Sequence, residues 1–241
     1  MSYRDKLYST YVSTHASSLY GSTTMDDIKR QIPTWKKYYA KLLPKDKDTE
    51  ILDIGCGDGG FVYFLRTLGF KNVKGIDLSK EQVELAGNLG IKGVIQADIK
   101  EFLSNKSAAY DVVFARDVIE HFAKDEVLEI LEMIHRSLRR GGILVAQTIN
   151  GESFFSGGLR YGDFSHEIVF TRSSLNQIFN VTGFKAIEFH PTGPVPKGLK
   201  SFVRYILWKM IEIVLRLRLL IETGSGEGVF TQNIIAAGRK P

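Results

Sequence analysis

Three glycines and an acid form the strongest chemical pattern in this chain. The run ILDIGCGDGG places Gly55, Gly57 and Gly60 between a strand pattern and a helix pattern, with the G-x-G-x-x-G spacing of a nucleotide-like ligand site. Asp53 comes two residues before this turn, where a carboxylate would repel the pyrophosphate of a dinucleotide. A ligand with a cationic amino acid end suits an acid at that position. The alternative is a purely structural role, in which the glycines form only a tight turn.

Two further acids end the next apolar runs. Asp77 closes NVKGID, 20 residues after Gly57, where an acid accepts hydrogen bonds from ribose hydroxyls. Asp98 ends QAD and is placed to accept from an adenine amino group. S-adenosylmethionine (SAM) has an α-ammonium, a sulfonium and an adenosine but no phosphate, so it fits all three acids. The alternative for Asp77 is a cap on the helix that Ser79 opens.

Strand patterns alternate with helix patterns around these residues, which predicts a parallel sheet covered on both faces. A helix over 26–43 is expected to be capped by Thr23 or Thr24. A second helix over 125–140 is expected to close at Gly141 and Gly142. The expected strands are 50–54, 72–78, 92–98, 110–116, 141–149 and 230–240.

The segments DIGCGDGG, GIDLS, QADI and YDVVFARDVIEHF, in this order and spacing, resemble the class I SAM-dependent methyltransferases over about residues 40–150. The resemblance implies an α/β fold with a Rossmann-like seven-stranded sheet, helices on both faces and an antiparallel last strand. It implies SAM as the cofactor, and it implies roles for a set of residues near the strand ends. Asp53, Gly55 and Gly57 would face the methionine part, Asp77 and Leu78 the ribose and adenine, Asp98 and Ile99 the adenine, and Arg116 and Asp117 the pocket floor.

Cys56 is the only cysteine and sits inside the cofactor turn. No second cysteine or histidine lies near it in the sequence to activate it, so packing within the cofactor turn is favoured over a nucleophilic role. A single cysteine excludes an internal disulfide and favours a reducing compartment. The expected location is therefore the cytoplasm, with peripheral contact at the inner face of the membrane as a further expectation.

Composition and charge narrow the classes of protein to which this chain can belong. The chain has 241 residues, 44% of them hydrophobic, enough for one large domain with appendages. Its first residues lack the apolar core of a secretory signal, and no run of about 18 uncharged apolar residues is present. The net charge of +5 says little about nucleic acid, and none is expected as a partner. ARDV follows the fourth strand in place of an N-P-P-Y-like tetrad, which disfavours methylation of DNA bases.

Motifs in the second half of the chain indicate which subfamily of these methyltransferases it resembles. GDFSH, FTRSSL and TGF resemble bacterial methyltransferases that act on cell-surface polysaccharides and sugars. Thr171 is expected to cap a helix that ends at Gly183. The resemblance predicts O-methylation of a sugar or polysaccharide precursor. The alternatives are a small aromatic or quinone-like acceptor, a dinucleotide-dependent oxidoreductase, and a SAM-binding regulator without turnover.

Methyl transfer to a hydroxyl needs a base, and two histidines are candidates. His166 lies in the loop after the fifth strand, and Asp163 or Glu167 could hold its ring in one tautomer. His121 follows the fourth strand and is the rival. A structural histidine in both places is the third alternative. No cluster at metal-ligand spacing stands out, so no metal is predicted.

Residues 197–222 have no counterpart in the minimal fold and read as a C-terminal amphipathic helix. Six basic and two acidic residues give this segment a charge of about +4. One alternative is a core helix or homodimer seam. The other is an interfacial helix that contacts anionic headgroups.

The predicted organisation is an N-terminal helical arm or lid over 1–45 and a methyltransferase domain over 46–241. Residues 151–222 are expected to be acceptor-side insertions for a small-molecule or glycan acceptor. Tyr11, His15 and Tyr20 of the arm either cover the cofactor or pack on a neighbour.

Overall fold

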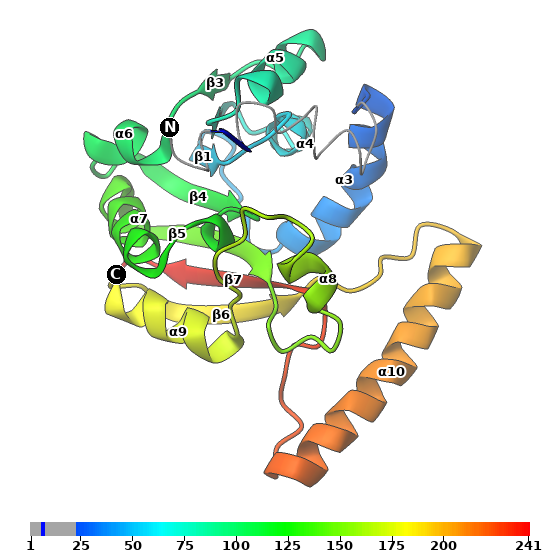
Figure 1. Cartoon of the computed structure of the whole chain (residues 1–241). Helices are drawn as coiled ribbons and strands as arrows, with labels where there is room; N and C mark the ends of the chain where they lie inside the picture. The colour runs from blue at the N-terminus through cyan, green and yellow to red at the C-terminus, as the bar shows by residue number, and fades with distance from the viewer. Residues whose placement is uncertain (1–5, 8–22) are drawn as a thin grey trace.

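The computed structural model describes residues 6–7 and 23–241, which form a seven-stranded mixed sheet flanked by helices (Figure 1). The strand order is β3-β2-β1-β4-β5-β7-β6, and β7 is antiparallel to both of its neighbours. The strands are β1 (Glu50–Ile54), β2 (Asn72–Asp77), β3 (Val94–Gln96), β4 (Tyr110–Arg116), β5 (Leu138–Ile149), β6 (Lys185–Pro191) and β7 (Asn233–Arg239). The predicted sheet with an antiparallel last strand is confirmed.

Helices cover both faces of this sheet. Those on the two faces are α3 (Met25–Tyr39), α4 (Gly60–Thr67), α5 (Lys80–Asn88), α6 (Ile99–Ser104), α7 (Lys124–Ser137) and α9 (Arg172–Val181). The short α8 (Gly157–Arg160), the 3₁₀ turn η2 (Ile119–His121) and α10 (Leu199–Thr223) complete the order. Successive strand residues point to opposite faces, so Ile51 belongs to one core cluster and Leu52 to the other. The Ile51 cluster packs under α3, α4 and α5, and the Leu52 cluster under α6, α7 and α9.

Two predicted helix starts are confirmed. The Thr24 hydroxyl accepts from the Asp27 N–H, and the Asp27 carboxylate accepts from the Thr24 N–H, so a capping box begins α3. Thr171 opens α9 in the same way through the Ser174 N–H. These short polar signals identify helix starts well because the side chains replace helical partners that the first N–H groups lack.

The predicted end of the 125–140 helix is wrong. α7 stops at Ser137, and Leu138 is already extended and pairs with Tyr110 of β4. Gly141 and Gly142 lie inside β5, where they exchange backbone hydrogen bonds with Lys240. The strand starts early because sheet pairing on both sides offers partners that a further helical turn would not, so the glycines serve the strand and not a helix cap.

The 197–222 helix forms, as α10, but the core-helix alternative is wrong. None of its 25 residues is buried, and the helix stands beside the body on two extended connections (Figure 1). Among the described residues, no helix has the length and hydropathy needed to cross a membrane.

Tyr11, His15 and Tyr20 lie outside the described residues, so their predicted lid or arm role stays a prediction. The described part of the predicted arm, α3, packs on α4 through Trp35, whose ring centroid is 5.7 Å from those of both Phe61 and Phe64. α3 thereby lies over the face of the sheet next to the glycine turn.

Candidate active site

Glycines with positive φ shape the turn between β1 and α4. Gly55 and Gly57 have φ of +63° and +55°, in the left-handed region that favours glycine. A methyl group on Gly55 would run into the side chain of Val118, just after β4. The turn therefore lies close to the carboxyl end of β4, the edge of a parallel sheet where ligands bind.

Asp53 carries a carboxylate that is buried without a hydrogen-bond partner among the described residues. Its side chain is 1% exposed, and neither oxygen is bonded. Burial raises the pKa of Asp53 to about 7, while the nearby charge of Arg116 opposes that rise. Buried polar atoms are nearly always paired, so a cationic group bound against this carboxylate would supply the missing donors.

Arg116 ends β4 among aromatic rings. Its guanidinium carbon lies 4.2 Å from the ring centroid of Phe61 and 5.5 Å from that of Trp35. Such stacking stabilises a desolvated guanidinium. The structure thus places Arg116 near Asp53, whose pKa it influences, and against Trp35 of α3.

Asp77 links two turns. Its Oδ2 accepts from the Gly57 N–H and its Oδ1 from the Ser79 N–H, both at 2.8 Å. Ser79 itself caps α5 by accepting from the Gln82 N–H, so Asp77 is not the helix cap. A carboxylate has about four acceptor sites, and two of those on Asp77 are left for hydroxyl donors. Burial raises its pKa.

We predict that Asp77→Ala weakens SAM binding roughly 5- to 150-fold, because about 1–3 kcal/mol is lost when partners of a charged group are stranded. Isothermal titration calorimetry measures this, with the exposed Glu84→Ala of the following helix as the matched control. An Asp77→Ala affinity equal to that of Glu84→Ala would remove Asp77 from the cofactor site.

Three residues predicted near the adenine lie at the ends of β2 and β3. Asp98 is exposed and caps α6, with its Oδ1 accepting from the Lys100 and Glu101 N–H groups. Leu78 is 44% exposed and Ile99 is half-buried, so apolar surface stands next to that carboxylate. The cap role of Asp98 was not predicted, and its role toward adenine stays a prediction.

Cys56 packs inside the fold. The residue is 8% exposed, and its sulfur packs against Gly75 of β2. A side chain at position 75 would collide with that sulfur. Burial, and then the charges of Asp53 and Asp77, raise the pKa of the thiol. The thiol is therefore protonated at neutral pH and poorly nucleophilic, in line with the packing role expected from the sequence.

Gln147 was not predicted as a site residue, and it connects α3 to the residue that follows β4. The Tyr39 hydroxyl donates to Gln147 Oε1, and Gln147 Nε2 donates to Asp117 Oδ2, each at 2.7 Å. Asp117 has a φ of +55°, unusual for a residue other than glycine, and is held there just after β4. The available signal was a lone glutamine inside the apolar strand run ILVAQTI.

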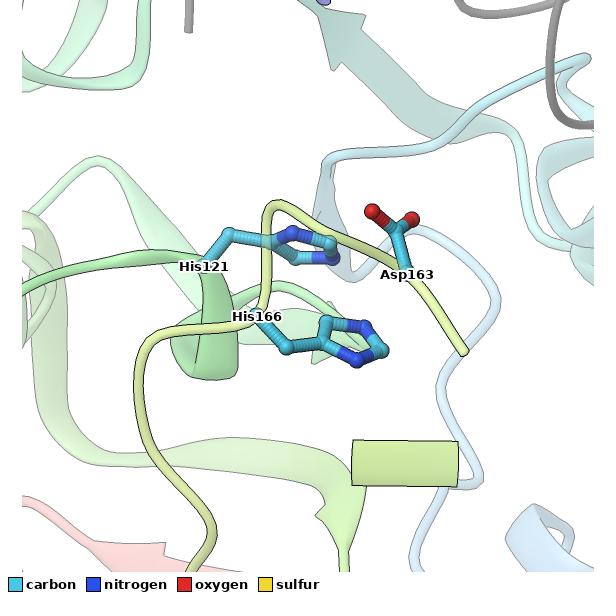
Figure 2. Close-up of side chains that lie close together, drawn as sticks. All are labelled: His121, Asp163 and His166. Atoms are coloured by element: carbon cyan, nitrogen blue, oxygen red, sulfur yellow. The ribbon is translucent and has the colours of Figure 1, made fainter. Parts of the chain in front are cut away.

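The two histidines that the sequence set against each other lie side by side. The Glu167 and Ile168 N–H groups donate to the carbonyl oxygen of Glu120, which ties the loop after α8 to η2. The ring centroids of His121 and His166 are consequently 4.7 Å apart, with Asp163 next to them (Figure 2). Glu120 was also missed; its side chain is fully buried, and burial, then the charge of Asp117, raises its pKa well above normal.

Hydrogen bonds indicate the same tautomer for both rings. His166 Nδ1 lies 2.9 Å from the Leu159 carbonyl, which can only accept. His121 Nδ1 lies 2.8 Å from Ser165 Oγ, whose proton is directed to Asp163 Oδ1 at 2.5 Å. Both Nδ1 atoms therefore carry a proton, and in the neutral His166 ring the acceptor lone pair lies on Nε2.

The role of Asp163 or Glu167 in holding the His166 ring stays a prediction, and the structure adds a main-chain partner that the sequence did not predict. His166 Nδ1 donates to the main-chain carbonyl oxygen of Leu159, while Asp163 accepts from Ser165, whose Oγ bonds His121 Nδ1. The loop folds back over α8, so a carbonyl that the sequence pattern could not place reaches the ring.

His121, Asp163 and His166 also form a set that could hold a metal ion, since one ligand atom from each lies within 4.8 Å of the others. Two imidazoles and a carboxylate are typical ligands of catalytic metals. No sequence spacing indicated this set, because the fold brings its members together.

A methyltransferase-domain family model matches residues 28–188. This chain belongs to that family. The methyltransferase uses SAM as methyl donor, and the orphaned carboxylate of Asp53 fits the cofactor's ammonium. The dinucleotide-dependent oxidoreductase and the regulator without turnover, both left open by the sequence, are thereby wrong.

Named relatives share the family. The methyltransferase is 37% identical over 106 residues to a ubiquinone biosynthesis O-methyltransferase of Rickettsia canadensis, covering 42% of this chain and 43% of that protein. It is 30% identical over 178 residues to the Paraburkholderia xenovorans protein of the same name, covering 72% of this chain and 63% of that one. The chain thus matches about half the length of these relatives.

Solved structures share the fold at low identity. A Haemonchus contortus phosphoethanolamine N-methyltransferase 2 with bound SAM superposes with a TM-score of 0.66 at 19% identity, covering 100% of this chain and 60% of that one. A SAM-dependent methyltransferase from Archaeoglobus fulgidus gives 0.61 at 19% identity, covering 89% and 92%.

Proposed function

We propose that the methyltransferase transfers the SAM methyl group to a hydroxyl of a small aromatic, quinone-like acceptor. The His166 imidazole, whose Nδ1 donates to the Leu159 carbonyl oxygen and whose Nε2 can accept a proton, is the observation that carries O-methylation, because a hydroxyl must lose its proton. The relatives named for ubiquinone biosynthesis favour the quinone-like acceptor over the sugar or polysaccharide acceptor that the sequence favoured first.

The cofactor placement is part of this proposal. Asp53 and the turn with Gly55, Cys56 and Gly57 hold the methionine part, and Arg116 lies beneath it. Asp77 takes the ribose hydroxyls. Leu78, Asp98 and Ile99 surround the adenine. Two observations support this placement. The buried Asp53 carboxylate has no hydrogen-bond partner among the described residues, and the exposed Asp98 carboxylate has the apolar side chains of Leu78 and Ile99 as neighbours.

We assign the base role to His166, with His121 beside it. SAM supplies a methyl group that is open to in-line displacement, so positioning can provide most of the rate. His166 Nε2 takes the hydroxyl proton as the new oxygen–carbon bond forms and the sulfur–carbon bond breaks. The charge of Asp117 lies near enough to His166 for the two to interact, so it would stabilise the imidazolium that results.

An acceptor panel with methyl-labelled SAM tests the proposal. A prenylated dihydroxybenzene, a matched dimethoxy analogue, a free sugar and a nucleotide sugar are compared. We expect label on the dihydroxybenzene alone, bound through oxygen. Label on a sugar, or on the dimethoxy analogue, would overturn the proposed acceptor.

An acceptor with an apolar tail partitions into lipid. We therefore propose a cytoplasmic enzyme that meets its acceptor at the inner face of the membrane. The homodimer expected from the sequence stays a prediction.

A further inference from the structure

α10 has one face turned toward the body. Trp208, Leu215 and Leu219 are half-buried and recur at helical spacing. Arg216 holds this face in place, because its guanidinium donates to the carbonyl oxygens of Gly226 and Gly228 in the connection to β7. The orientation of the helix about its axis is therefore defined.

The opposite face is a continuous apolar stripe open to solvent. Its members are between 43% and 81% exposed and fall within one arc at 100° per residue. Exposed apolar patches of this extent on soluble proteins mark interaction sites. The stripe consists of Leu199, Phe202, Val203, Ile206, Leu207, Met210, Ile213, Val214, Leu217, Leu220 and Ile221.

Basic residues border the stripe on both sides. Lys200, Arg204 and Arg218 project along one border, and Lys209 and Arg216 along the other. Two acids offset part of this charge: Glu212 pairs with Lys209 and Arg216, and Glu222 pairs with Arg218. The borders stay net positive.

We propose that this stripe lies in the headgroup region of an anionic lipid bilayer. A second copy of the chain would bring two net-positive borders together, which costs free energy. Lipid phosphates complement both borders while the acyl chains receive the stripe, the arrangement of an interfacial helix.

The helix also lies beside the connection between β5 and α9, which carries both α8 and His166. The Arg218 guanidinium is 4.9 Å from the ring centroid of Phe154, and Phe155 and Phe164 of the same loop are 80% and 84% exposed. The lipid-facing surface therefore continues from α10 to the acceptor side of the active site.

Co-sedimentation of the full chain with vesicles tests this proposal without turnover, so its outcome is independent of the acceptor. We expect binding to vesicles of phosphatidylcholine with one-quarter phosphatidylglycerol, and weaker binding to phosphatidylcholine alone or in 0.5 M salt. Lys200→Gln should lower the partition coefficient about fivefold. Lys80→Gln on α5 is its control and should leave it unchanged.

The stripe is tested by the double substitution Ile206→Glu and Ile213→Glu, with Val181→Glu at the end of α9 as the exposed apolar control. We expect the stripe variant to stay in the supernatant while it binds S-adenosylhomocysteine normally, and the control to sediment. Wild-type protein that stays in the supernatant at low salt would overturn the proposal. So would a stripe variant that still sediments, or a wild-type dimer that this variant converts to monomer.

Discussion

His166→Ala is expected to lower kcat by roughly 10²–10⁴, the usual contribution of a general base. SAM affinity should change little, since His166 is assigned to the acceptor hydroxyl and not to the cofactor. Loss of the imidazole removes the Nε2 lone pair that the Leu159 carbonyl keeps free by fixing the proton on Nδ1. Steady-state rates on the dihydroxybenzene acceptor, together with calorimetry of cofactor binding, measure both effects.

His190→Ala is the matched control because this histidine lies on β6, at the far edge of the sheet from β1. Its rate should stay within a factor of two or so of wild type, as expected for a substitution away from special features. A second control separates base from metal: the wild-type rate should survive EDTA. A loss that a divalent cation restores, or a His166→Ala enzyme with normal turnover, would contradict the base role.

Asp53→Asn is expected to weaken SAM binding roughly 10- to 150-fold, because a hydrogen bond to a charged group contributes about 1.5–3 kcal/mol. The raised pKa of about 7 adds a pH dependence. Below pH 7 the buried carboxyl of the free enzyme is mostly protonated, and the cofactor's ammonium favours the ionised form. Affinity should therefore fall about tenfold for each pH unit below 7.

Titrations at pH 6 and pH 7.5 with both proteins check this, since the ratio of wild-type to variant affinity cancels the cofactor's own titration. The ratio should rise with pH. In the absence of cofactor, the free energy of unfolding of the wild type should fall as pH rises toward 7, because the unfolded chain releases the Asp53 proton first. A ratio that does not change with pH would contradict a raised Asp53 pKa.

The sheet could be predicted because its signals are local. Apolar runs of strand length, glycine turns and capping threonines each describe a few consecutive residues. The start of β5 could not, because Leu138 becomes extended through pairing with Tyr110, nearly 30 residues away. The exposure of α10 was equally hidden: its sequence carries apolar residues on all sides, and only the tertiary structure shows which face meets the body.

The residues of the candidate site also divide into those that local sequence signals predict and those that depend on tertiary contacts. Asp53, Asp77 and Asp98 end or flank strand runs, so their place at one edge of the sheet could be predicted from the strands alone. The pairing of His121 with His166 depends on backbone bonds from Glu167 and Ile168 to Glu120, which no spacing indicates. Gln147 and Glu120 were missed because a single polar residue inside an apolar run carries no signal of its role until the fold places it.

A crystal structure with S-adenosylhomocysteine and the dihydroxybenzene acceptor tests the central claim most directly. We expect the cofactor's amino group on the Asp53 carboxylate and an acceptor hydroxyl about 2.6–3.2 Å from His166 Nε2, in line with the cofactor sulfur. An acceptor bound with its hydroxyls turned away from both histidines, or a cofactor seated apart from Asp53, would contradict it.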